Sequence, residues 1–171
     1  SDATIEFTGL DASKYDAYVV VLENVIPATD AQELYLRTDS DGGASYDAGA
    51  GSYSWKTLVT ADNNSLQVDE DQSDTEIHLI GAGSAGGEMI GSGTNEDGLS
   101  GRIYIDGAHL TKRTHITWEV TFQNDLTTDQ LNISVGTAMV LAAADTDAIQ
   151  FLMSSGNIES GTFNLYGLTN A

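Results

Sequence analysis

Short segments in which apolar and polar residues alternate are the feature that most constrains the fold of this chain. The clearest is 114–123, in which the apolar residues recur at every second position as Ile116, Trp118, Val120 and Phe122. A period of two places successive side chains on opposite faces of a β-strand. One face of this segment is therefore predicted to pack on a core and the other to meet water. No segment has the apolar period of a long amphipathic helix, so the sequence predicts an all-β protein.

Further strands are predicted at 4–7, 15–26, 34–38, 53–60, 76–80, 99–106 and 131–141, the last interrupted at Gly136. Both faces of 15–26 are apolar, which predicts a central strand that stops at Pro27. In 53–60, the side chains predicted to share one face are Trp55, Thr57 and Val59. In 34–38, Leu34 and Leu36 are predicted to point inward, and the residues predicted to point outward are Glu33, Tyr35 and Arg37.

The closing segment 147–168 is predicted to form a hairpin of two strands folded back on each other. One arm carries Ile149, Phe151 and Met153, and the other arm carries Phe163, Leu165 and Gly167. Between the arms, Gly156 and Asn157 tolerate the positive φ that a tight reversal needs. The turn is therefore expected at these two residues.

Length and composition favour one β-domain over residues 1–171. Eighteen glycines and a single proline, spread among short apolar runs, suit strands and turns. A chain of this length buries roughly 70 % of its unfolded surface without a disulfide or a metal. It has no cysteine, which excludes thiol chemistry. The predicted fold is an antiparallel β-sandwich of jelly-roll type with about eight to ten strands.

The charge of the chain excludes several classes of partner. Twenty-six acidic residues and six basic ones give a formal net charge of −20. This charge repels phosphate backbones and anionic lipids, so neither nucleic acid nor membrane is an expected partner. No apolar run approaches the ~20 residues of a membrane span, and the first residues carry no signal-peptide pattern. We expect a product made in the cytoplasm whose initiator methionine has been removed.

Two acidic segments are candidate cation sites. Residues 39–46 resemble the Asp-box turn of sialidase-like proteins, in which an aspartate accepts backbone N–H bonds. We interpret the segment as a structural turn, and the alternative is a calcium site on Asp39, Asp41 and Asp47. Carboxylates also dominate 69–76, which we interpret as a solvated loop, although such a run could gather a divalent cation.

The segment Gly81–Gly86 matches the dinucleotide-binding pattern G-x-G-x-x-G. That site requires a helix to begin at once, whereas the following residues are rich in glycine and lack a helical period. The sequence therefore predicts a long flexible loop over about 81–101, and no cofactor.

No catalytic residue and no metal site is predicted. The three histidines, His78, His109 and His115, lack H-x-H or H-x-x-x-H spacing, and there is no G-x-S-x-G elbow. Carboxylate pairs for glycoside hydrolysis are too numerous among 26 acids to be informative. The aromatic side chains predicted to be exposed are Tyr35, Tyr46, Tyr53 and Tyr104. They could stack on a sugar or cover a neighbouring subunit, but cross-strand pairing is the preferred interpretation.

Motifs at both ends of the chain resemble a group of small phage virion proteins. Residues 155–168 match that group's closing motif, SGNI-x-SGT-x-x-LYG. The group's opening half looks similar to Tyr15–Tyr18, N-V-I-P-A-T-D at 24–30, and L-x-L-R-T at 34–38 followed by D-G-G at 41–43. The middle, from about Asp62 to Thr111, carries little of the resemblance. These are strand and turn signatures, so the resemblance transfers no catalytic residue.

The resemblance implies a virion structural protein, most simply a decoration or cement protein on the capsid surface. Its partners would be the major capsid protein and other copies of itself, expected as homotrimers. The alternative is a receptor-binding module of a tail fibre or spike that recognises host-surface carbohydrate; the chain shows no coiled-coil stalk of the kind a fibre tip uses. Because copies with this charge repel one another, attachment is expected to use apolar and backbone contacts or basic patches of the capsid.

Overall fold

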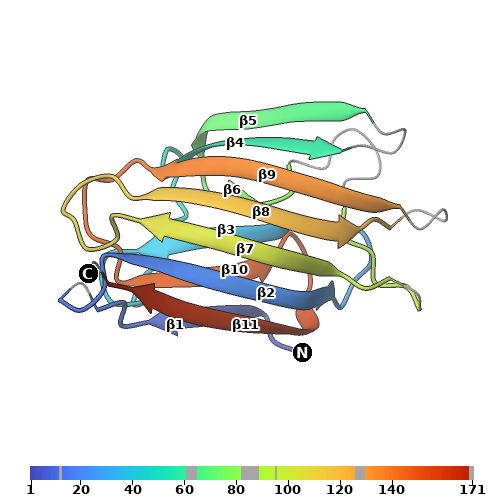
Figure 1. The fold of residues 1–171 in the computed structure, drawn as a ribbon, viewed down its shortest axis with the longest axis horizontal. Helices are drawn as coiled ribbons and strands as arrows, with labels where there is room; N and C mark the ends of the chain where they lie inside the picture. The colour runs from blue at the N-terminus through green and yellow to red at the C-terminus, as the bar shows by residue number, and fades with distance from the viewer. Residues whose placement is uncertain (12, 61–64, 82–88, 95, 126–129, 170–171) are drawn as a thin grey trace.

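The structure is a computed structural model that describes residues 1–11, 13–60, 65–81, 89–94, 96–125 and 130–169. These residues form eleven β-strands and no helix. The strands make two antiparallel sheets that pack face to face (Figure 1). The predicted antiparallel β-sandwich in a single domain is therefore confirmed.

The smaller sheet has four strands in the order β1 (Thr4–Thr8), β10 (Ala148–Met153), β3 (Leu34–Asp39) and β6 (Ile77–His78). The larger sheet has seven strands in the order β11 (Ile158–Leu168), β2 (Ala17–Pro27), β7 (Leu99–Asp106), β8 (His115–Gln123), β9 (Leu131–Val140), β4 (Tyr53–Thr60) and β5 (Leu66–Asp74). The chain passes from one sheet to the other after β1, β2, β3, β5, β6, β9 and β10. Strands distant in sequence are thus interleaved around one core.

The core lies between the sheets and is formed by the alternating positions that the sequence marks as apolar. In β8 the buried residues are Ile116, Trp118, Val120 and Phe122, as predicted, while the residues between them are exposed. In β4, Trp55, Thr57 and Val59 are buried together with Tyr53. The period-2 pattern therefore predicted the inward face of both strands correctly.

The closing segment is not the predicted hairpin. β10 pairs with β1 and β3 in the smaller sheet, whereas β11 pairs with β2 in the larger sheet. The two strands face each other across the core, and the rings of Phe151 and Phe163 lie 5.2 Å apart. The turn is where it was expected, since Gly156 has φ 73°. An apolar face on each arm is consistent with two strands that pair in one sheet and equally with two strands that pack on each other from opposite sheets. The alternating pattern therefore could not show which arrangement the closing segment adopts.

Three other strand predictions need correction. β2 lies second from the edge of its sheet, and Val19 and Val21 on its outer face are only partly buried, so it is not covered on both sides. Within the acidic segment, Glu70 and Asp71 are solvent-exposed as predicted, whereas Asp69, Asp74 and Glu76 are partly buried. Leu66–Asp74 forms the edge strand β5, paired with β4, where a loop was predicted. Charged side chains on an edge strand oppose pairing with other chains. Of the predicted strand 76–80, only Ile77–His78 is β-structure.

Gly136 does not interrupt β9, which runs without a break from Leu131 to Val140. Gly136 lies opposite Trp118 on β8, and a Cβ at Gly136 would overlap Cζ2 of that indole. The glycine therefore leaves room for the largest core side chain.

The predicted flexible loop 81–101 is only partly described, because 82–88 and 95 lie outside the described residues. β7 already begins at Leu99. Ile90 is fully buried and forms β-bridges with Gln32 and Asn124. The described part of this segment is therefore attached to the sandwich at Ile90.

We expect Gly136→Ala to lower the free energy of unfolding by about 1–3 kcal/mol, because the added methyl group must displace the Trp118 ring in a close-packed core. Guanidinium denaturation measures the change. Gly49→Ala is the control, since a Cβ there meets only Ser52 Oγ at 3.8 Å. Equal stability of Gly136→Ala and the wild type would contradict the packing explanation.

Candidate functional site

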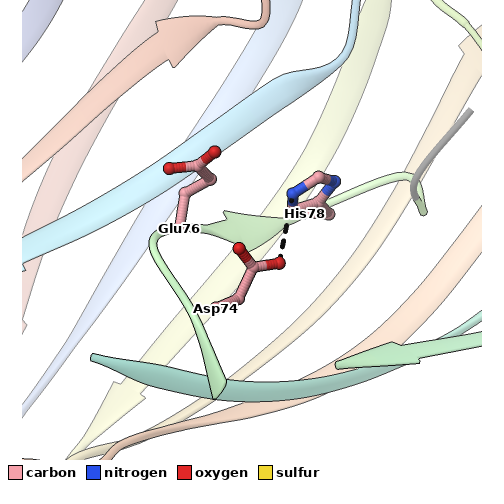
Figure 2. A group of neighbouring side chains, drawn as sticks. All are labelled: Asp74, Glu76 and His78. Atoms are coloured by element: carbon pink, nitrogen blue, oxygen red, sulfur yellow. Dashed lines mark ion pairs between the residues drawn. The ribbon is translucent and has the colours of Figure 1, made fainter. Parts of the chain in front are cut away.

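A cluster of charged side chains lies where β3, β6 and the end of β5 meet. Its members are Glu33, Arg37, Asp74, Glu76 and His78. Glu33 directly precedes β3, Arg37 lies on β3 and Asp74 ends β5. Glu76 lies in the β5–β6 connection and His78 on β6. Figure 2 shows Asp74, Glu76 and His78 as neighbours. One ligand atom from each of these three residues lies within 4.8 Å of the others. We call these five residues the charged cluster.

His78 is at the centre of the charged cluster. Its Nδ1 lies 2.8 Å from Oε2 of Glu33, and its Nε2 lies 3.4 Å from Oδ2 of Asp74. The imidazole stacks on the Trp55 ring, with centroids 4.8 Å apart and planes at 15°, and it also contacts Tyr35 at 4.4 Å. Aromatic rings thus fix the plane of the imidazole, and carboxylates lie at both of its nitrogens.

Opposing effects act on the pKa of His78. Burial lowers it, whereas the hydrogen bond and charge of Glu33 raise it, with further contributions from Asp74 and Glu76. The carboxylates prevail, so the pKa of His78 lies above its ordinary value of 6.5. In its protonated form, the imidazolium of His78 bridges the carboxylates of Glu33 and Asp74.

The two carboxylates on the β5–β6 segment are held in place by other groups. Oδ2 of Asp74 accepts a hydrogen bond of 2.9 Å from Nε1 of Trp55, and Oδ1 accepts one of 2.6 Å from the Thr75 amide. Oε2 of Glu76 accepts from Arg37 Nη2 at 3.0 Å and from Thr75 Oγ1 at 2.7 Å. Both side chains are therefore oriented before any ligand arrives.

A buried serine positions β6 beneath this cluster. Ser134 of β9 donates from Oγ to the Leu79 carbonyl at 2.7 Å, directly after β6. The same Oγ accepts from Trp118 Nε1 at 3.3 Å and lies 2.8 Å from Thr57 Oγ1. On its other side β6 pairs with β3, where Tyr35 lies opposite His78. Ser134 of the larger sheet thus anchors β6, the strand of the smaller sheet that carries His78.

Sequence reasoning missed this group. Glu33 was predicted to point outward, but its side chain is 7 % exposed and contacts His78. A usable signal was present, because Asp74, Glu76 and His78 occupy alternate positions, which places their side chains on one side of an extended segment. The H-x-H and H-x-x-x-H spacings detect only sites with two histidines, so they do not recognise this combination of one histidine with two carboxylates. His109 instead contacts Asp16, and His115 is exposed on β8, so the described residues do not bring the histidines together.

The Asp39 segment is a structural turn, as preferred. Asp39 is buried, and its carboxylate accepts hydrogen bonds from the backbone amides of Asp41 and of Ser45, the latter at 2.8 Å. Burial and then the charge of Asp39 raise the pKa of Asp47. Within the described ranges, Asp39, Asp41 and Asp47 do not form a group with metal-ligand spacing. Of the G-x-G-x-x-G segment, only Gly81 lies within the described residues.

The predicted exposed tyrosines have different environments. Tyr53 was predicted wrongly: it is fully buried, accepts from the Thr38 amide at 2.7 Å and donates to the Asp47 carbonyl at 3.0 Å. Burial raises the pKa of Tyr53 to about 12. Tyr35 and Tyr46 are partly buried, and burial raises the pKa of each. Tyr104 is exposed on β7, as predicted.

The outer face of the larger sheet carries a group of exposed apolar side chains. They lie on the neighbouring strands β4, β5 and β9 (Figure 1), and we call them the apolar face: Leu58, Leu66, Val68, Leu131, Ile133 and Val135. Leu58 lies directly opposite both Val68 and Val135, so these three form a continuous row along a shallow groove. Val68 is 68 % and Leu131 is 73 % exposed. Contiguous exposed apolar groups of this kind mark interaction surfaces.

Comparison with known proteins gives no match among protein families, curated proteins or solved structures. The described part of the chain contains no helix long and apolar enough to cross a membrane.

The position of the imidazolium between carboxylates predicts a pH-dependent stability. A folded-state pKa above 6.5 means that His78 contributes its full stabilisation below about pH 6.5 and loses it as the pH rises through the folded pKa. With EDTA present, the difference in unfolding free energy between the wild type and His78→Gln should be larger near pH 6 than near pH 9. Urea denaturation at both pH values measures it.

His115→Gln is the matched control for this prediction, because His115 is exposed on the outer face of β8. The free energy of unfolding of His115→Gln should differ little from that of the wild type at both pH values. A His78→Gln difference that is independent of pH would show that folding does not raise the pKa of His78.

Proposed function

We propose that this protein is a phage virion structural protein, a decoration or cement protein that attaches to the capsid through the apolar face. The observation that carries the proposal is the concentration of exposed apolar side chains on β4, β5 and β9 of a chain with a net charge of −20. The resemblance of residues 15–43 and 155–168 to small virion proteins supports the same assignment. The proposed role is structural and involves no catalysis.

The charge pattern around the apolar face indicates what its partner should look like. Glu119 lies directly opposite Val135, and Glu70 and Lys56 form an ion pair at the border of the groove. An interface typically has an apolar centre and a polar rim. The matching surface of the major capsid protein should therefore present apolar side chains surrounded by Lys and Arg. This arrangement gives attachment to the capsid that does not rely on salt bridges between the acidic copies.

One observation favours the second candidate, a tail-associated module that binds host-surface carbohydrate. Tyr104 and Tyr166 are exposed and both lie opposite Val19, on the outer face of β7, β2 and β11. Exposed aromatic rings on a sheet can stack on sugar rings. Because Tyr104 and Tyr166 are separate from the apolar face, the two candidates predict different effects of mutation.

The capsid assignment is tested with particles assembled without the protein. Val135→Asp should weaken co-sedimentation with these capsids at least ~10-fold, because it places a charge in an apolar interface beside Glu119. Leu110→Asp, at an exposed leucine between β7 and β8, should bind like the wild type. Circular dichroism checks that both variants fold.

Antibody labelling of complete particles separates the two candidates. Label over the head supports decoration, whereas label confined to the tail tip overturns it in favour of the receptor-binding module. Capsid binding that is unchanged in Val135→Asp, or lost equally in Leu110→Asp, would show that the apolar face is not the attachment surface.

We further propose that the protein occupies the capsid as homotrimers. Copies that each carry a formal charge of −20 repel one another. At physiological ionic strength, salt screens this repulsion beyond a Debye length of ~8 Å, and added salt shortens that length. Sedimentation of the isolated protein should therefore show association that strengthens as salt rises. A protein that stays monomeric at every salt concentration, and that occupies isolated positions on the particle, would show the trimer to be wrong.

A further inference from the structure

We propose that Asp74, Glu76 and His78 form a binding site for a first-row divalent transition-metal ion of the zinc type, with Glu33 as the group that orients the imidazole. This proposal rests on the geometry of the charged cluster and does not depend on the proposed virion role. The combination of one imidazole and two carboxylates suits zinc-like ions, whereas calcium prefers oxygen ligands throughout.

The spacing of the ligand atoms fits a tetrahedral ion. Zinc bonds to nitrogen and oxygen are ~2.0–2.2 Å long, which places two tetrahedral ligand atoms ~3.4 Å apart. The distance from Nε2 of His78 to Oδ2 of Asp74 is 3.4 Å, longer than an ordinary hydrogen bond. The ligand atoms of all three residues lie within 4.8 Å of one another, so small side-chain movements bring Glu76 into the set.

Glu33 supplies the second observation. Its side chain is 7 % exposed, and its Oε2 lies 2.8 Å from Nδ1 of His78. Among the residues that the structure describes, these two buried atoms have no hydrogen-bond partner apart from each other. A carboxylate that accepts from Nδ1–H fixes the tautomer in which Nε2 is a free lone pair, as in the carboxylate–histidine–zinc arrangement. The free nitrogen is the one that lies beside Asp74 and Glu76.

The charges of the cluster also favour a divalent ion. Glu33, Asp74 and Glu76 carry three negative charges, and Arg37 neutralises one of them. With the imidazole neutral, two negative charges remain in a partly buried place, and a divalent cation balances both. Arg37 can stay bound to one oxygen of Glu76 while the other oxygen coordinates, because a carboxylate has two acceptor atoms. Trp55 and Thr75 keep Asp74 in position.

The proposal is tested by isothermal titration of the EDTA-treated, dialysed protein with zinc chloride. Excess magnesium is present to occupy non-specific sites among the 26 acidic residues. We expect one zinc per chain and a rise in melting temperature on saturation. His78→Gln should abolish this one-to-one binding, and Glu33→Gln should weaken it ~10–100-fold, because an outer carboxylate typically contributes that much to affinity.

His115→Gln is the matched control and should bind zinc like the wild type. Glu76→Gln, at a partly exposed side chain, provides a second ligand variant if His78→Gln does not fold. The absence of one-to-one binding in the wild type, or zinc affinity that is the same in His78→Gln and Glu76→Gln as in His115→Gln, would overturn the site.

Discussion

A polar group buried between the two sheets costs free energy unless it has a hydrogen-bond partner. Ser134 meets this requirement for several groups at once, since its fully buried hydroxyl contacts Trp118, Thr57 and the Leu79 carbonyl. Through Leu79 it ties the two-residue strand β6 to the larger sheet, while β3 pairs with β6 from the smaller one. The packing of Trp118 over Gly136 belongs to the same region. The position of His78, and with it the charged cluster, depends on this junction.

Strand β5 connects the two functional proposals. Its outer side contributes Leu66 and Val68 to the apolar face, and its last residue, Asp74, belongs to the charged cluster. Its remaining exposed acids discourage pairing along the free edge of the sheet. One edge strand therefore presents an apolar surface for association, an acidic edge that opposes it, and a carboxylate for a metal ion. Strict alternation would put Asp74 on the same side as Leu66 and Val68, but the register shift between Trp55 and Tyr53 places it opposite the buried Tyr53 instead.

The local alternation of apolar and polar residues predicted the strands better than it predicted which strands pair with each other. The inward faces of β4 and β8 follow from alternation alone, and the reversal at Gly156 follows from the need for a positive φ. The partners of β10 and β11 did not follow, because pairing within a sheet and packing across a core require the same apolar side chains. Tyr53 was misjudged for a related reason: its hydroxyl is satisfied by Thr38 and Asp47, which are remote from it in the strand pattern. The charged cluster was partly visible, since Asp74, Glu76 and His78 alternate in sequence, but Glu33 is far along the chain from His78.

The amino-acid sequence by itself determined that this protein is an all-β sandwich, that its surface is strongly acidic, and which side of most strands is buried. These properties depend on the residue at each position and on its immediate neighbours, which the sequence contains directly. Tertiary structure alone decided which strands share a sheet, which exposed apolar residues gather on β4, β5 and β9, and which acids surround His78. Those outcomes depend on contacts between segments distant in sequence, and the same local pattern is compatible with many such contacts.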